Sequence, residues 1–481
     1  MRPVAHPIGK IVIALGAFML APMAVDLWHG DPHWMVFLEC AAITISTGLL
    51  VTVANRDARR RALTIQQAFL LTSGLWVVLP VFGALPFILG APNVGVTDAF
   101  FEAMSGVTTT GTTVFPALND LPMGTHLWRA LLQWMGGLGI VVVAMVFLPV
   151  MKVGGMQFFR SEGFDTLGKI LPRAGEIAAE MTIIYVIMTA ACAITYMVLG
   201  MTGFDAVVHA LTTCSTGGFS NYDASFGAYL GAPEWAASVF MVLASVPFIR
   251  LVQAMRGSTA PLVHDLQVRT YLKLIVIVCA MILLYRLAWL EQDVPLAEAV
   301  RETVFNTIST FSGTGFASTD MTTWGHLPFA LLIIVGLIGG CTGSTGCSVK
   351  IFRYQVLFQA VRAQIRRMHS PHRLYPLRYG GQPLDKGVID SVMAFFTLFM
   401  LTFGLLIVGL ALTGLHPRTA LTAAWTSIAN VGPAWGPEIS PNGSVVEFPA
   451  AAKWMMATGM YLGRLELVSV LVLLLPRFWR P

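Results

Sequence analysis

Residues 108–112 read Thr-Thr-Thr-Gly-Thr, and short polar runs built around glycine recur three more times along the chain. The other runs are Cys-Ser-Thr-Gly-Gly-Phe at 214–219, Ser-Gly-Thr-Gly-Phe at 312–316 and Ala-Asn-Val-Gly-Pro at 429–433. The intervals are 106, 98 and 117 residues when the equivalent glycines are taken as Gly111, Gly217, Gly315 and Gly432. Four runs at near-constant intervals predict four copies of one structural unit.

The composition around these runs is that of a membrane protein. Of the 481 residues, 56% are hydrophobic and 11% are charged, and the mean hydropathy is +0.72. Soluble domains carry roughly 25% charged residues, so the chain lacks the polar surface that three soluble domains of its length would need. The composition excludes a cytosolic enzyme, a disordered chain and a disulfide-stapled secreted domain.

Neither the net charge nor the cysteines indicate another class of function. The net charge of +5 is explained by basic cytoplasmic loops, so we expect no nucleic-acid partner. The six cysteines lie in or beside apolar stretches and have no metal-binding spacing.

Ten stretches reach the roughly 20 apolar residues that a helix needs to cross the hydrocarbon core. They are approximately 9–28, 34–54, 66–90, 126–150, 178–200, 234–256, 270–290, 322–340, 388–412 and 448–475. Half-apolar segments of about a dozen residues precede the glycine runs and are too short to span, so we expect re-entrant helices there.

The predicted fold is therefore an all-α polytopic membrane protein. Four pseudo-repeats of span, re-entrant pore helix and span surround a central pore, after two additional N-terminal spans. The expected boundaries are 1–62 for the N-terminal spans and 63–165, 166–262, 263–378 and 379–481 for the four repeats.

The distribution of Lys and Arg predicts the orientation. Of the 30 Lys and Arg residues, 24 lie at the two termini or in the connections near 55–62, 151–177, 250–273 and 350–386. By the positive-inside rule these segments are cytoplasmic. Both termini are then inside, which requires an even number of spans.

Acidic residues collect on the opposite side, where they would concentrate cations in an outer vestibule or simply solvate ordinary loops. They are Asp26, Asp31, Asp98, Glu102, Asp120, Asp205, Asp223, Glu234, Glu291, Asp293, Asp320, Glu438 and Glu447.

The glycine runs have the chemistry of an ion filter. A dehydrated cation needs oxygen ligands, and backbone carbonyls supply them where extended chain lines an aqueous cavity. Glycine allows the required dihedral angles, and each short helix points its negative C-terminal end at the same place. The filter residues predicted in this way are Thr109, Thr110, Gly111, Ser215, Thr216, Gly217, Gly313, Thr314, Gly315, Asn430, Val431 and Gly432. The alternative is that these runs are simple interhelical turns.

Two further features lie within spans. The segment 339–350 reads Gly-Gly-Cys-Thr-Gly-Ser-Thr-Gly-Cys-Ser-Val-Lys, and its glycines and hydroxyls break a helix in mid-span. Exposed backbone polar groups must face a cavity or protein, so we expect a pore-lining position, with a plain kink as the alternative. We expect Arg464 near the middle of the last span, where burying a charge costs at least ~2.5–3.5 kcal/mol. It should face the pore or a partner charge, with a structural contact to Glu466 or to a loop carbonyl as the alternative. Glu466 is a poor partner because residues two apart on a helix diverge.

Together these features resemble the Trk/Ktr/HKT superfamily of cation transporters, and the two additional N-terminal spans resemble the TrkH family of pore subunits of bacterial Trk potassium-uptake systems. The resemblance covers nearly the whole chain. It implies potassium as the transported ion, with rubidium accepted, because glycine at the first filter position accompanies potassium preference in the superfamily. The potassium ligands it implies are the carbonyls of Thr110, Gly111, Thr216, Gly217, Thr314, Gly315, Val431 and Gly432.

The resemblance also implies a gate and partners. Segment 339–348 is similar to the intramembrane loop that closes the pathway below the filter, and Arg464 matches an arginine that acts as a barrier and contacts the closed loop. The implied gate residues are Gly340, Cys341, Thr342, Gly343, Ser344, Thr345, Gly346 and Arg464. The family further implies a homodimer in the lipid bilayer and a cytoplasmic nucleotide-binding subunit of the TrkA type. We expect that subunit to dock on the basic connections at 350–386, 151–177 and 250–273.

The favoured function is potassium uptake across the bacterial inner membrane, with no cofactor in the chain. The sequence contains no nucleophile–base or metalloprotease pattern, so we do not expect an enzyme, and we expect a packing role for His209 in the second pore helix. A proton- or sodium-coupled cation symporter of the same fold is the alternative. Coupling would use intramembrane carboxylates, and outside the vestibule only Glu39, Glu180 and Glu466 lie near spans.

Overall fold

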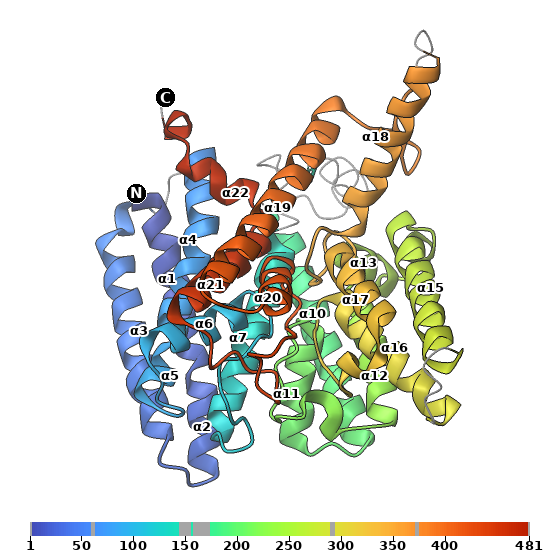
Figure 1. Ribbon diagram of the computed structural model, residues 1–481. Helices are drawn as coiled ribbons and strands as arrows, with labels where there is room; N and C mark the ends of the chain where they lie inside the picture. Colours follow the sequence, from blue (N-terminus) through green and yellow to red (C-terminus); the bar gives the residue numbers. More distant parts are fainter. Residues whose placement is uncertain are drawn as a thin grey trace.

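The computed structural model describes residues 2–58, 63–143, 155–156, 174–288, 294–370 and 375–479. These residues form a bundle of helices, as the sequence predicts (Figure 1). Both chain ends lie at the same end of the bundle, and helix α18 (Ile351–His369) projects beyond its neighbours there (Figure 1). The basic cluster at 59–61, most of the 151–177 connection and the acids at 291 and 293 lie outside the described residues.

The N-terminal helices form a hairpin at one edge of the bundle. Helices α1 (Arg2–Phe18) and α2 (Leu20–Trp28) follow one another, and α3 (Trp34–Ala54) returns beside them. A methyl group on Gly9 would lie 2.8 Å from the carbonyl oxygen of Gly48, so the two backbones meet at glycine. Small residues at a close crossing are typical of helix pairs in membranes.

Four units of span, pore helix and span follow, which is the predicted repeat architecture. The first spans are α4 (Ile65–Gly83) with α5 (Leu85–Leu89), α10 (Ala174–Val198), α15 (Leu266–Ala288) and α19 (Lys386–Leu412). The pore helices are α6 (Val96–Val107), α11 (Gly203–Cys214), α16 (Leu296–Ser312) and α20 (Pro417–Ala429). The second spans are α7 (Met123–Val142), α12 (Ala232–Ala244) with α13 (Phe248–Met255), α17 (His326–Ile338) with α18, and α21 (Ala450–Arg464) with α22 (Val468–Leu471).

Short elements complete the described chain. Helix α14 (Ala260–Val263) links the second and third repeats, and single 3₁₀ turns lie at Arg56–Ala58, Ser225–Ala228, Met321–Trp324, Val472–Leu474 and Pro476–Trp479. The connection from α18 to α19 holds a two-stranded hairpin, β1 (Arg378–Tyr379) and β2 (Gln382–Pro383), which the all-helical prediction did not include.

Several spans are bent or broken. Among the described residues, six helices or consecutive helix pairs are long and apolar enough to cross a membrane. The pairs α12–α13 and α21–α22 reach that length only across bends of 100° and 102°. The first bend lies at Pro247, whose ring prevents the helix from continuing. The remaining two predicted spans correspond to α7, which carries several polar side chains, and to α17, which ends at Ile338, just before Gly339.

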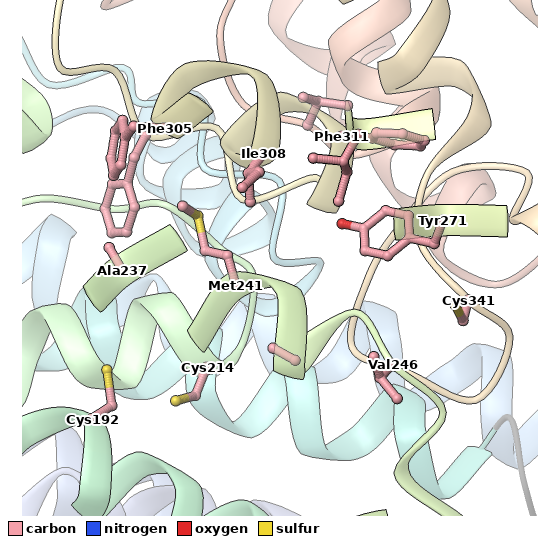
Figure 2. Packing of buried hydrophobic residues seen from close by; sticks show 14 of the residues in the cluster. Cys192, Cys214, Ala237, Met241, Val246, Tyr271, Phe305, Ile308, Phe311 and Cys341 are labelled. Carbon is pink, nitrogen blue, oxygen red and sulfur yellow. The ribbon is translucent and has the colours of Figure 1, made fainter. Parts of the chain in front are cut away.

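The pore helices are anchored by apolar packing from the spans. Figure 2 shows Ala237 and Met241 of α12 in the same hydrophobic cluster as Phe305 and Ile308 of α16. Cys214, at the end of α11, belongs to this cluster too. Two repeats thus share one core, which fixes the ends of their pore helices relative to one another.

Candidate functional site

Each pore helix is followed by a left-handed residue and, two positions later, by a left-handed glycine. The first set is Thr109, Thr216, Gly313 and Asn430, with φ of 53°, 52°, 78° and 52°. The second set is Gly111, Gly218, Gly315 and Gly432, with φ of 87°, 75°, 81° and 113°. A left-handed residue ends a helix, and glycine adopts this conformation without steric cost. The chain therefore leaves all four pore helices in the same way.

One backbone hydrogen bond per repeat fixes the register. The N–H of the residue before each filter glycine donates to the carbonyl five positions earlier. These bonds are Thr110 to Ser105 at 2.9 Å, Gly217 to Thr212 at 2.9 Å, Thr314 to Ser309 at 2.9 Å and Val431 to Thr426 at 3.2 Å. Gly217 is therefore the counterpart of Thr110, and Gly218 is the counterpart of Gly111.

This register corrects the sequence-based equivalence in the second repeat. Taking Gly217 as the counterpart of Gly111 is wrong by one residue, because two adjacent glycines satisfy the pattern equally well. Ser215 consequently lies before the left-handed residue, and its hydroxyl donates to the carbonyl of Thr212 at 3.2 Å. The Phe that follows the glycine in both the second and third runs carried the signal for the correct register, since Phe219 then corresponds to Phe316.

The four glycines close a ring. A methyl group built on Gly111 would collide with the carbonyl oxygen of Gly217, and one on Gly218 would collide with that of Thr314. A methyl group on Gly315 would collide with the carbonyl of Val431. On Gly432 it would lie 2.8 Å from the carbonyl oxygen of Thr110, which returns to the first repeat. Each glycine thus lies against a carbonyl of the next repeat, so the polar runs meet around one centre.

A cavity of about 100 Å³ opens outside this ring. All four left-handed glycines line it, and Asp223 is its one acidic lining residue. Asp223 accepts hydrogen bonds from the N–H of Leu118 at 2.9 Å and from Asn442 Nδ2 at 3.0 Å. The carboxylate therefore joins three repeats at the outer mouth.

Most of the other vestibule acids have structural partners. Asp26 is hydrogen-bonded to His33 Nδ1 at 2.8 Å. Ion pairs join Asp98 to Lys453 at 2.7 Å, Glu102 to Arg129 at 2.8 Å and Glu234 to Arg301 at 2.7 Å. These contacts favour the interpretation in which the outer acids mainly hold the fold, and Asp223 differs from them in that it also lines the cavity beside the filter.

Asp205 stabilises the outer loop of the second repeat. It accepts hydrogen bonds from Tyr229 at 2.6 Å, Asn221 at 2.6 Å, Thr202 at 2.7 Å and Tyr222 at 2.9 Å. Burial alone would raise the pKa of this carboxyl, but the four hydrogen bonds outweigh that effect and the pKa lies below its usual value.

The glycine-rich segment 339–350 lies below the filter, on the side away from the outer cavity. Residues 339–347 are all buried. The N–H of Cys341 donates to Ser245 at 2.9 Å, and the N–H of Phe248 donates to Gly343 at 2.9 Å, so the loop is attached at the bend between α12 and α13. Thr345 Oγ1 donates to the carbonyl of Cys214 at 3.3 Å, directly beneath the second pore helix.

Cys347 brings this loop against the filter itself. Its sulfur lies 3.6 Å from Thr109 Oγ1. A methyl group on Gly313 would lie 3.2 Å from Cys347 Cβ. Two of the four left-handed residues below the ring therefore contact the same side chain. Cys347 lies within the predicted gating segment 339–348, but the individual gate residues predicted from the sequence ended at Gly346.

Arg464 reaches the loop from the opposite side. Its Nη1 donates to Cys347 Sγ at 2.7 Å and to the carbonyl of Thr345 at 3.2 Å. The side chain is buried, and its Nε and Nη2 have no hydrogen-bond partner among the described residues. Helix α21 ends at Arg464, so this residue terminates a broken span and does not lie in the middle of a continuous helix.

Glu466 pairs with a different arginine. Its carboxylate lies 2.5 Å from Arg353 Nη2, in the helix that follows the loop. Its φ of 58° lies in the left-handed region, in the break between α21 and α22. This agrees with the expectation that Glu466 does not serve Arg464.

Two polar groups of α7 that sequence reasoning missed hold the filter from behind. Arg129 donates from Nη1 to the carbonyl of Ser220 at 2.9 Å while paired with Glu102. Gln133, one helical turn further on, donates from Nε2 to the carbonyl of Gly217 at 2.6 Å. Polar residues inside a predicted span were the available signal.

His209 has the structural role expected for it. Its Nδ1 lies 2.9 Å from the carbonyl of Asp205, and its Nε2 lies 3.1 Å from Ser220 Oγ. No group of three or more His, Cys, Asp or Glu side chains among the described residues is arranged to hold a metal. The carbonyl ring is the arrangement that can replace the hydration shell of a monovalent cation.

Comparison with known proteins identifies relatives along the whole chain. The TrkH family model, described as a cation transport protein, matches residues 33–480. The chain is 39% identical over 480 residues to the Trk system potassium uptake protein TrkI of Halomonas elongata, covering 99% of this chain and 97% of the relative. It is 31% identical over 488 residues to the Trk system potassium uptake protein TrkH of Escherichia coli K12, covering 100% of this chain and 99% of the relative.

A solved structure agrees in fold. The crystal structure of the potassium transporter TrkH from Vibrio parahaemolyticus superposes with a TM-score of 0.91 at 31% sequence identity. The match covers 100% of this chain and 99% of the other.

Proposed function

This chain belongs to the TrkH family of cation transport proteins, and from that premise we propose that it carries potassium ions across the bacterial inner membrane. The family transports cations and is not a family of enzymes. The observation that carries the proposal is the closed contact of four left-handed glycines with four carbonyl groups, one from each repeat. Relatives named as potassium uptake proteins support potassium as the ion.

The proposed ligands are backbone oxygens. In the register described above they are the carbonyls of Thr110, Gly217, Thr314 and Val431, with those of the following glycines above them. Neutral carbonyl oxygens replace the hydration shell of a large monovalent cation without the strong attraction of carboxylates. Rubidium, which resembles potassium in charge and size, should also pass.

Uptake of rubidium-86 into potassium-loaded proteoliposomes of the purified chain tests this proposal. We expect uptake that unlabelled potassium blocks more strongly than sodium does. Gly111→Ser should abolish this preference, because its side chain would collide with the carbonyl of Gly217. Uptake that sodium and potassium block equally in the wild type would refute a potassium filter.

Gly95→Ser is the matched control. Gly95 precedes the same pore helix, has open space around its Cα and has no left-handed φ. A serine there should leave uptake and ion preference unchanged, so loss in Gly111→Ser alone would locate the effect at the filter.

We further propose that segment 339–348 is the gate and that Arg464 stabilises its closed position. The contacts of Cys347 with Thr109 and with Arg464 support this proposal, because they connect the loop, the filter and a buried positive charge. A cation leaving the filter would meet both the loop and that charge.

A cytoplasmic subunit of the TrkA type is the proposed partner that opens the gate. Its proposed docking surface is α18 with the connection to α19, where Arg362, Arg366 and Tyr375 line a groove of about 880 Å³. Phe358 and Met368 expose 70% and 80% of their surfaces on this projecting helix, which suits a protein partner.

Neutralising Arg362, Arg366 and Arg367 to Gln should weaken capture of the purified partner at least tenfold and make it less sensitive to salt. Lys10→Gln with Arg56→Gln, two exposed basic residues of the N-terminal region, is the control and should leave capture unchanged. Full capture by the triple variant would exclude this surface.

We propose the orientation and assembly expected from the sequence: both termini in the cytoplasm, in a homodimer within the bilayer. The location of both chain ends at one end of the bundle supports the shared side (Figure 1).

A coupled symporter of the same fold is the second candidate. Glu102 and Glu466 are buried carboxylates inside the repeats, as coupling would require. Each is held in an ion pair with an arginine, at 2.8 Å and 2.5 Å, which favours a structural role. Rubidium uptake that stops when the proton and sodium gradients are both removed would favour coupling.

A further inference from the structure

Gln133 is the side chain of α7 that lies against the second filter segment. It is fully buried, and its amide makes two hydrogen bonds to this segment. Nε2 donates to the carbonyl of Gly217 at 2.6 Å, and Oε1 accepts from the N–H of Phe219 at 3.1 Å. The backbone N–H of Phe219 is only a donor, so it fixes which end of the amide faces which group.

Gln133 also explains why glycine stands at position 217. The other three repeats have a β-branched residue at this position: Thr110, Thr314 and Val431. Gly217 is not left-handed, so its backbone conformation would accept a side chain. A methyl group there would instead collide with the amide of Gln133. The glutamine of one repeat occupies the space that a β-branched side chain fills in the others.

The filter is therefore asymmetric. Four carbonyls lie against the ring glycines, those of Thr110, Gly217, Thr314 and Val431, and among the described residues only the carbonyl of Gly217 accepts a hydrogen bond from a side chain. A carbonyl oxygen has two lone pairs, so one can face Gln133 while the other faces the ion. A glycine without this bond would be the most mobile position in the ring, because glycine has the greatest backbone freedom.

We propose that Gln133 is a specificity-determining positioning residue, whose amide fixes the direction of the Gly217 carbonyl and thereby the ability of the ring to distinguish dehydrated potassium from sodium. This inference rests on the proposed function of the carbonyl ring. It adds a side chain outside the filter that sets the geometry of one of its four segments.

Ion-dependent thermal unfolding of the purified full-length chain in detergent tests the inference, because binding to the filter does not require an open gate. An ion that binds the folded state raises the unfolding midpoint with its concentration. Leucine is similar in size to glutamine but makes no side-chain hydrogen bonds. In Gln133→Leu, the sodium concentration for half-maximal stabilisation divided by the potassium concentration for half-maximal stabilisation should fall about fivefold. This change corresponds to the loss of one net hydrogen bond. A folded Gln133→Leu with the wild-type ratio would overturn the inference.

Gln267→Leu is the matched control. Gln267 is also buried, and its Oε1 accepts from the N–H of Thr342 at 2.9 Å, in the loop below the filter. We expect its variant to keep the wild-type ion ratio. An equal fall in both variants would indicate a general loss of rigidity and would also overturn the inference.

A second pair of variants tests the inference if Gln133→Leu fails to fold, by adding a side chain at position 217 and removing the one at position 133. Gly217→Thr alone should lose potassium-dependent stabilisation, because its side chain meets the amide. Adding Gln133→Ala should restore part of it, since threonine then fills the site as it does in repeats one and three. No recovery in the double variant would refute the idea that Gln133 occupies the space of a β-branched side chain.

The outcomes separate the two proposals. If the wild type itself shows no preference for potassium, the proposed function fails. If both the wild type and Gln133→Leu prefer potassium to the same degree, only the role of Gln133 is contradicted.

Discussion

Arg464 differs from the other buried arginines in the described part of the chain. Arg129, Arg286 and Arg353 each lie within 2.5–2.8 Å of a carboxylate oxygen. Arg464 has neutral partners, the sulfur of Cys347 and a loop carbonyl. A buried charge without a counter-ion is costly, so a role beyond stability accounts for it best.

Arg464→Met should increase rubidium leak through the chain without its partner subunit, because the substitution removes the charge and keeps much of the side-chain volume. We expect an increase on the order of tenfold, corresponding to ~1.4 kcal/mol. Arg464→Lys should stay close to the wild type if charge is the barrier. Flux assays on both variants, with Arg286→Met as a control for the loss of a buried arginine, would separate charge from packing. Equal leak in the Lys and Met variants would contradict an electrostatic barrier.

At the scale of elements, the loop between α17 and α18 combines firm attachment with an irregular path. Gly339, Gly343, Ser348 and Lys350 all have left-handed backbone, with φ of 73°, 78°, 69° and 74°. Two of them are not glycine, so part of this conformation is strained and must be held by the surroundings. A strained segment held by a few hydrogen bonds can move as a unit when other partners replace those hydrogen bonds.

Thr109→Cys tests this loop as a gate. Cysteine at 109 would face Cys347, because the present Oγ1–Sγ distance is 3.6 Å. Oxidation with copper phenanthroline should form a disulfide between loop and filter and abolish uptake, and dithiothreitol should restore it. Thr109→Cys with Cys347→Ser should not respond. A disulfide detected by mass spectrometry without loss of flux would exclude the gate.

Asp205, at the start of α11, should make the stability of the protein depend on pH in a way that can be measured. Because the pKa of Asp205 is lowered in the folded protein, its stabilisation is complete above the unfolded pKa of about 3.9 and is lost as pH falls through the lower folded pKa. Asp205→Asn should reduce stability by about 2 kcal/mol at neutral pH. The difference in unfolding midpoint from the wild type should stay constant from about pH 8 to 5. The exposed Asp120→Asn is the control, and a difference that already shrinks above about pH 5 would contradict a lowered pKa.

The elements also show which features a sequence pattern can predict. Spans and pore helices can be predicted from apolar length and repeat spacing. The solved structure of a relative confirms the fold class predicted in this way. The register at Gly217 depends on which glycine faces a neighbouring carbonyl, a contact between residues about a hundred positions apart. The break after Arg464 was missed because the flanking residues are as apolar as a continuous span. Gln133 could be noticed only as a polar residue inside a predicted span. Its partner could not be identified from the sequence, because a backbone carbonyl is present in every residue.

At the scale of the whole molecule, the first and last repeats must meet for the ring to close. Asn430 Nδ2 donates to Thr110 Oγ1 at 2.8 Å, and Thr112 Oγ1 donates to the carbonyl of Gly432 at 2.6 Å. Both bonds join residues 320 positions apart in the chain. The ring therefore closes only when the first and fourth repeats meet. This requires that all four pore helices enter the membrane from the same side.

Sidedness can be measured because the native thiols are hidden. All six cysteines are free and buried, so a membrane-impermeant maleimide should label the wild type only weakly. Trp28→Cys at the end of α2 and Met368→Cys on α18 introduce thiols at residues that are 88% and 80% exposed. The two helices lie at opposite ends of the bundle (Figure 1).

If the basic connections are cytoplasmic, the maleimide should label position 28 in spheroplasts and position 368 in inverted vesicles. The reverse pattern would invert the proposed topology, and labelling of both positions from one side would contradict a bundle that spans the membrane between them.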